Sequence, residues 1–188
     1  MPRIEQSFEV PTAPDRVWQF FQDVPQVVEC MPGVELDRVQ DEGRFAGRMN
    51  VKLGPMNAQF QGEAAIENLE AGSRTGSIAA RGVDKKGGSR ASARVRYEIN
   101  ETPSGTRVSL AADITLQGAM AQFGRTGLIE EVSGHLTREF AGCIEKKLSA
   151  ESPEDAAGVR AAEVRGFRLL LMSLWAWLRR AWSREGRS

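Results

Sequence analysis

The spacing of hydrophobic side chains changes along the chain and separates a strand-rich region from helical regions. From about residue 35 to residue 117, apolar and polar residues alternate with a period of two, which is typical of strands with one buried and one solvated face. The clearest alternating runs are 45–53, 58–66, 91–99 and 108–116, and turn-forming residues bound them at 53–56, 70–73, 86–89 and 103–105. The pattern predicts an antiparallel meander, since parallel strands would be longer apolar runs separated by helices.

Helical spacing appears on both sides of this meander. Residues 3–10 alternate and predict a first strand, and Thr12 then caps a predicted helix whose apolar face is Val17, Phe20, Phe21 and Val24. A second short helical piece ends at Pro32 and Gly33. After the meander, a long helix is predicted at about 120–148, because apolar residues recur there every three or four positions: Ile129, Val132, Leu136, Phe140, Cys143 and Ile144.

These elements predict an α+β fold. A sheet with one apolar face needs a cover, and the helix at about 120–148 is the only element long enough to supply it. We therefore expect a curved antiparallel sheet wrapped around a long C-terminal helix, with the short helices closing the other side. The domain is expected over residues 1–149, followed by a linker at 150–160 with Pro, Gly and an acidic cluster, and by a separate segment at 161–188.

Composition narrows the function. Lys and Arg number 25, as do Asp and Glu, so the overall charge gives no sign of nucleic-acid binding. The first residues lack an apolar signal segment, which favours a cytoplasmic protein. Cys30 and Cys143 are far apart and have no metal-ligand spacing, so we expect two buried free thiols rather than a disulfide or a zinc site.

Candidate catalytic residues are few. His135 is the only histidine, and it lies at the flank of the helical stripe beside Glu131 and Glu139, where a solvated side chain is expected. No nucleophile converges with it and no metal-binding set is present, so we expect no enzymatic activity. Tyr97 is the only tyrosine and belongs to the apolar face of its strand.

Small residues on the apolar face of the sheet leave two interpretations open. They are Gly47, Ala58, Gly62, Ala64, Ala80, Ala91, Ala93 and Ala112. Either the helix approaches the sheet closely, or an apolar cavity lies between them, since protein interiors are otherwise densely packed. The residues that would line such a cavity are Phe20, Met31, Phe60, Ala64, Ala91, Ala93, Tyr97, Met120 and Phe123. Gly118, Gly124 and Gly127 loosen the start of the long helix, as a gate or as a simple turn.

The segment 161–188 is amphipathic. On a helical wheel its apolar arc includes Phe167, Leu170, Leu171, Leu174, Trp175, Trp177, Leu178 and Trp182, and the opposite side carries cations, among them Arg179 and Arg180. Its unbroken apolar run, 169–178, is far shorter than the roughly 20 residues that span a bilayer. We expect a helix that lies in the membrane interface, with arginines on anionic lipid. The alternative is that it docks on its own domain or on a partner protein.

Several short motifs resemble one known family. Residues 8–35 carry Ala13-Pro14 with Val17-Trp18, then Asp23 to Gly33 with Cys30 inside it, and Val51 to Pro55 form a later turn. These motifs closely resemble the CoxG family, the G subunits of carbon monoxide dehydrogenase, which belongs to the START-like (SRPBCC) helix-grip superfamily. The resemblance covers roughly residues 3–148. It implies a curved sheet that holds a helix around an apolar cavity.

The resemblance also implies a function. Family members are non-catalytic accessories of a carbon monoxide dehydrogenase or related molybdenum hydroxylase, peripheral on the inner face of the cell membrane. They carry an isoprenoid quinone, menaquinone or ubiquinone, as a hydrophobic ligand without covalent attachment. We therefore expect a quinone carrier held at membrane lipids by its tail. The alternatives are a tether without ligand, a generic START-like lipid-binding protein, and an enzyme of the cyclase type.

Overall fold

A computed structural model describes residues 3–40, 43–53, 56–125, 127–150 and 158–160. The predicted amphipathic helix, and most of the predicted linker, lie outside the described residues. Along the chain the elements are β1 (Arg3–Val10), α1 (Pro14–Gln22), α2 (Val24–Glu29), β2 (Val34–Val39), β3 (Arg44–Leu53), β4 (Met56–Glu70), β5 (Thr75–Asp84), β6 (Ser89–Thr102), β7 (Gly105–Gln117), the 3-10 helix η1 (Gly118–Arg125) and α3 (Leu128–Ser149).

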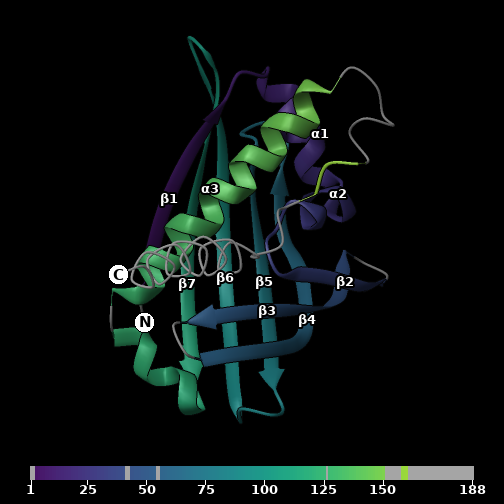
Figure 1. The fold of residues 1–188 in the computed structure, drawn as a ribbon. Helices are drawn as coiled ribbons and strands as arrows, with labels where there is room; N and C mark the ends of the chain where they lie inside the picture. The colour runs from purple at the N-terminus through teal and green to yellow at the C-terminus, as the bar shows by residue number, and fades with distance from the viewer. Residues whose placement is uncertain (1–2, 41–42, 54–55, 126, 151–157, 161–188) are drawn as a thin grey trace, which may run out of the picture.

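The strands form one antiparallel sheet in the order β1-β7-β6-β5-β4-β3-β2. Figure 1 shows that this sheet curls strongly, with β2 and β3 running crosswise to β6 and β7, and that α3 crosses the concave side. A sheet with one apolar face curls in this way around a covering helix because the apolar surfaces of the sheet and of the helix are then both buried. The predicted α+β fold, a curved antiparallel sheet wrapped around a C-terminal helix, is confirmed.

The register of the strands confirms the predicted apolar face. In β6, Tyr97 and Ile99 are buried, while Arg96 and Glu98, the residues that alternate with them, are exposed. Tyr97 pairs with Leu110 of β7 and with Gly76 of β5, and a Cβ on Gly76 would overlap the tyrosine ring. The tyrosine therefore packs flat over its neighbouring strand, which only glycine permits.

Two hydrophobic clusters form the core. The larger one joins α1, α2 and the C-terminal half of α3 to β1, β6 and β7, through Val10, Val17, Trp18, Phe20, Phe21, Cys30, Tyr97, Ile99, Val108, Cys143, Ile144 and Leu148. The smaller one lies at the η1 end, where Ala58, Phe60 and Met120 are buried. The concave face between the clusters is less well covered.

Two helix starts differ from their sequence predictions. Helix α1 has Ala13 at its N-cap and no side-chain cap bond, so the predicted capping by Thr12 is wrong. The Thr12 carbonyl instead accepts a 2.6 Å hydrogen bond from the Thr106 hydroxyl, which ties the start of α1 to β7. The long helix begins at Leu128 rather than near 120, because Gly118 takes a left-handed conformation (φ 75°) and residues 118–125 form η1.

Candidate ligand-binding site

The middle of the concave face is a continuous apolar surface. Two rows of paired residues cross β4 to β7 there, and we call them the apolar floor: Ala64, Ala80, Ala93 and Ile114 in one row, and Ile66, Ile78, Val95 and Ala112 in the next. All except Ala80 are partly buried, and Ala80 is exposed. An apolar surface that keeps this much exposure inside a curled sheet is suited to contact with a hydrophobic ligand.

Helix α3 covers the apolar floor incompletely, since Ala80 stays exposed and the other floor residues are only partly buried. The backbone of α3 runs closest to β1 and η1. Phe140 of α3 packs edge-on against Phe8 of β1, with ring centroids 5.8 Å apart, and against Phe21 of α1 at 6.1 Å. These contacts hold the helix against β1 and α1 at one side of the sheet.

The nine residues predicted to line a cavity do not form one cluster. Phe20 and Tyr97 belong to the larger hydrophobic cluster, whereas Phe60, Met120 and, around them, Ala91 and Phe123 belong to the smaller one. Ala64 and Ala93 lie in the apolar floor between the clusters.

Met31 follows α2, and 38% of its surface is exposed. The sequence analysis did not assign the floor residues Ile66, Ile78, Val95 and Ile114 to the site, although the alternating runs placed Ile66, Val95 and Ile114 on the apolar face.

Tyr97 is part of the packed core. Its ring lies 5.1 Å from that of Phe21 and 6.3 Å from that of Trp18, measured between centroids. Burial raises the pKa of the Tyr97 hydroxyl above its ordinary value, because the phenolate is poorly solvated there. The side chain therefore stays neutral at physiological pH and has a hydroxyl rather than a negative charge near the ligand surface.

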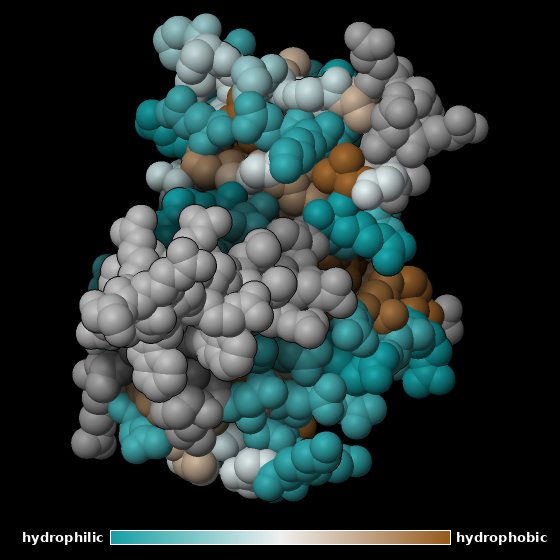
Figure 2. Space-filling model, viewed as in Figure 1, coloured by the Kyte–Doolittle hydropathy of each residue, from teal (hydrophilic) through white to brown (hydrophobic). Residues whose placement is uncertain are grey.

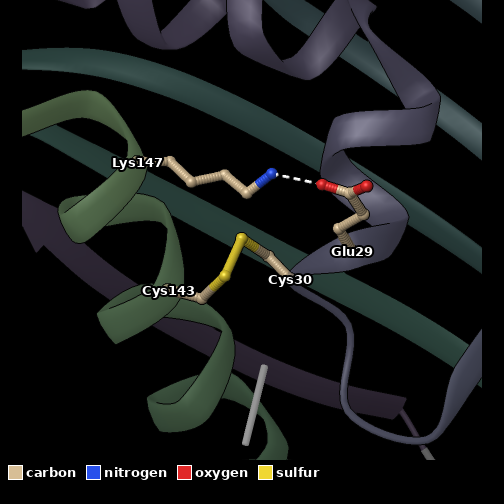
Figure 3. The surroundings of a disulfide bond; sticks show 4 residues. All are labelled: Glu29, Cys30, Cys143 and Lys147. Carbon is tan, nitrogen blue, oxygen red and sulfur yellow. Dashed lines mark hydrogen bonds and ion pairs between the residues drawn. A yellow bond between two sulfur atoms is a disulfide. The ribbon is translucent and has the colours of Figure 1, made fainter. Parts of the chain in front are cut away.

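The two cysteines form a disulfide, so the prediction of two free thiols is wrong. Cys30 follows α2 and Cys143 lies on α3, 113 positions later, and the fold brings their Cα atoms to 5.3 Å (Figure 3). This separation lies within the range that a disulfide requires. The sequence showed both residues on buried faces but gave no indication that α2 and α3 meet.

An ion pair between a buried lysine and a partly exposed glutamate accompanies the disulfide. Lys147 lies one helical turn after Cys143, and its ammonium donates a 2.6 Å hydrogen bond to the carboxylate of Glu29, the residue before Cys30 (Figure 3). Only 2% of the Lys147 side chain is exposed. Burying an ammonium is unfavourable unless a carboxylate pairs with it, so the two contacts together hold α2 against α3. They fix the end of the concave face at which Met31 is exposed.

The described residues offer little for catalysis. His135 is exposed on α3, as predicted, and no group of His, Cys, Asp and Glu side chains among the described residues has the arrangement of a metal site.

No described helix is long and apolar enough to cross a membrane. Figure 2 shows hydrophobic surface near β2, at the open side of the sheet, and Met31, Val39 and Leu69 are exposed apolar residues of the domain.

A seven-stranded antiparallel sheet curled around a C-terminal helix defines a helix-grip protein. Three solved structures share the fold: a conserved protein from Geobacillus kaustophilus (14% identity, TM-score 0.66, covering 77% of this chain and 93% of that one), the Zhui aromatase/cyclase from Streptomyces sp. R1128 (16%, 0.56, 84% and 98%) and Ara h 8.0201 (9%, 0.50, 78% and 97%). At these identities the likeness concerns the fold alone. No curated relative matches the chain.

The chain belongs to the CoxG family, the G subunits of carbon monoxide dehydrogenase, and the family model matches residues 7–149. The resemblance drawn from the Ala13-Pro14, Cys30 and Gly54-Pro55 motifs is thus confirmed, and the match ends at the last residue of α3. The family is that of an accessory subunit of a dehydrogenase.

Proposed function

We propose that this protein binds an isoprenoid quinone on the apolar floor and links a carbon monoxide dehydrogenase of the molybdenum hydroxylase type to the cytoplasmic membrane. The observation that carries the proposal is the apolar floor itself, which stays partly exposed although α3 crosses the concave side. A quinone is apolar along its isoprenoid chain, so small aliphatic side chains such as Ala93 and Val95 suit it through shape and burial alone. Its two carbonyl oxygens accept hydrogen bonds, and the neutral hydroxyl of Tyr97 is a donor at one end of the floor.

In this proposal the protein itself does no redox chemistry. The dehydrogenase supplies the electrons and the bound quinone accepts them, while the protein's residues position the ligand and exclude water from it. The sequence of 161–188, with its tryptophans and arginines, supports reversible attachment to anionic lipid on the inner face of the membrane. The domain and this segment together would place the ligand between the enzyme and the quinone pool.

Quinone binding is tested with two variants in which phenylalanine replaces alanine on opposite faces of β5. Ala80 is exposed on the concave face, and Ala79, its neighbour in β5, points to the opposite face. Full-length wild type, Ala80→Phe and Ala79→Phe are purified from host membranes, and the organic extract of each is analysed by mass spectrometry. We expect near-stoichiometric quinone with wild type and Ala79→Phe, and a large loss with Ala80→Phe. If the extracts contain no quinone and the protein still binds the dehydrogenase, the protein is a tether without a ligand. If the isolated protein turns over a substrate, it is an enzyme instead.

The membrane link is tested separately. Deletion of 161–188 should leave a folded domain that no longer sediments with vesicles containing anionic lipid, because the apolar arc and its arginines are removed together. Equal sedimentation of the truncated and full-length chains would show that the segment is not the attachment.

A further inference from the structure

The convex face of the sheet, on the side away from α3, carries a hollow of about 630 Å³ that the proposed quinone site does not use. We call it the outer hollow. It is lined by Arg38, Gln40, Ala46, Gln61, Glu63, Arg81, Val83, Lys85, Arg90, Ser92, Thr115 and Gln117, with Gly62, Gly82 and Ala91 at its base. A second hollow of about 350 Å³ shares Val83, Lys85, Arg90 and Gln117 with it and extends it to Gly118.

Strand register gathers these side chains. Arg81 of β5 pairs with Glu63 of β4 and with Ser92 of β6, and Val83, two residues on, pairs with Arg90. Residues two apart in a strand point to the same face, so these positions share the convex side. Gly62 and Gly82 contribute only backbone to the base of the hollow, because their positions alternate with these residues and belong to the opposite face of the sheet.

The outer hollow gathers positive charge. Several arginines elsewhere on the convex face are paired: Arg94 binds Glu67 through two hydrogen bonds of 2.8 Å, and Arg107 lies 2.6 Å from Glu9. Four cations line the hollow (Arg38, Arg81, Lys85 and Arg90), and Glu63 is the one acidic residue in the lining.

Glu63 contacts only Arg81, at 3.3 Å, and both side chains are largely exposed. Within the described part of the chain, no carboxylate pairs with Arg38, Lys85 or Arg90. Like charges held together without counter-ions attract an anionic partner.

One polar group in the hollow is also unsatisfied. The hydroxyl of Thr115 is buried and has no hydrogen-bond partner within the described residues. Buried hydroxyls are normally paired, so a group of this kind indicates a missing water or ligand oxygen.

The length of the hollow indicates what kind of anion fits. Its lining crosses six neighbouring strands, from Arg38 in β2 to Thr115 in β7, which is five intervals of about 4.8 Å, or roughly 24 Å. That is too long for a single phosphate and matches about seven residues of extended polypeptide at about 3.3 Å each. Val83 is 40% exposed in the middle of this path and offers an apolar contact between the charges.

We propose that the outer hollow docks an extended acidic segment of a partner protein, with the carboxylates of that segment against Arg38, Arg81, Lys85 and Arg90. This site lies on the opposite face of the sheet from the apolar floor. It can therefore be occupied whether or not a hydrophobic ligand is bound, and it does not depend on the proposed quinone.

The test uses full-length protein and an N-acetylated hexaglutamate peptide, with a water-soluble carbodiimide that couples carboxylates to lysine amines. Mass spectrometry of the digest identifies the coupled lysine, and arginines of the 161–188 segment do not react. We expect Lys85 to be the main site. The double variant Arg81→Gln/Arg90→Gln should lower coupling at Lys85 about fivefold, the effect expected from losing two exposed ion pairs.

A matched control removes the same net charge from the same face. Arg94→Gln/Arg107→Gln takes away two arginines that are already paired, and coupling at Lys85 should stay at the wild-type level. Equal loss in both double variants, or even coupling over Lys52, Lys85 and Lys146, would show a general charge effect and overturn the proposal. Sedimentation with anionic vesicles gives the second readout: if Arg81→Gln/Arg90→Gln reduces vesicle binding but not peptide coupling, the face meets lipid and the docking proposal is wrong.

Discussion

Reduction of the Cys30–Cys143 disulfide should lower the stability of the domain while leaving its fold intact. The bond joins two elements that are also held by the pair of Glu29 and Lys147 and by shared core packing. Both cysteines are buried, with exposed fractions of 0% and 5%, so the two thiols formed by reduction stay in the same apolar surroundings. The main loss is therefore the constraint that the bond places on the unfolded chain.

The size of this loss follows from the loop that the bond closes. With 113 positions between the cysteines, the chain-entropy relation gives an upper value of roughly 5 kcal/mol, and native disulfides typically contribute about 2–4 kcal/mol. For a domain of this size, a urea m-value of about 2 kcal/mol/M turns a loss of 3–4 kcal/mol into a midpoint lower by about 1.5–2 M.

Urea unfolding followed by far-UV circular dichroism measures the shift, with oxidised protein compared with protein that was reduced while unfolded and then refolded with a phosphine. Thiol counting in urea supplies the control, because oxidised protein should show no reactive thiol and reduced protein two. Two reactive thiols in unreduced protein, or identical midpoints, would refute the reasoning. Blocking thiols in intact host cells before lysis extends the test to the compartment, since disulfides are rare in cytosolic proteins.

Three further predictions follow from the core and the backbone. Tyr97, as the only tyrosine, should titrate at 295 nm with a midpoint above its ordinary value of about 10. In the unfolded chain the Tyr97 hydroxyl ionises at the ordinary value, so burial of the neutral side chain contributes its full stability below about pH 10. That stability is lost as the pH rises through the raised pKa, and the urea midpoint of unfolding should fall over this range. A titration midpoint at the ordinary value would contradict the burial of Tyr97. Glu29→Gln should cost about 1–3 kcal/mol in urea unfolding by leaving the Lys147 ammonium without its partner, whereas Lys147→Met should be close to neutral, and equal losses would argue against this account. Gly142→Ala should raise the stability by about 0.5–1 kcal/mol, since its Cβ meets open space on α3, whereas Gly62→Ala should lower it by about 1–3 kcal/mol or more; thermal melting of both variants checks that the signs are opposite.

Much of the fold could be predicted from local pattern. Side chains in a strand alternate between faces, so the runs around Tyr97 and Ile114 identified both the strands and the face that would be buried. Glycines at 118, 124 and 127 indicated a loosened start to the long helix, and η1 occupies much of that stretch. The Thr12 cap failed because α1 has Ala13 at its N-cap, one residue later than predicted, and the backbone of Thr12 is instead bound to the Thr106 hydroxyl of β7.

The chemical character of the candidate site could be predicted from the sequence, but its position could not. An apolar face rich in alanine was evident, but the two hydrophobic clusters, and the floor between them, depend on where α3 lies relative to β1 and β4. That position is set by contacts such as Phe8 with Phe140, which join residues distant in the sequence. The candidate residues Phe20 and Phe60 therefore came from the right face of their elements and lie in different clusters.

The sequence by itself determined the type of each element, the face that each one buries and the family to which the chain belongs, because these depend on residues within a few positions of one another. Tertiary structure alone decided which distant residues meet. It brought Cys30 to Cys143, left the apolar floor partly exposed beside α3, and placed Arg38, Arg81 and Arg90 of three strands around one hollow. The physical reason is that strand register and helix position are set by the packing of the whole domain, and no local period encodes them.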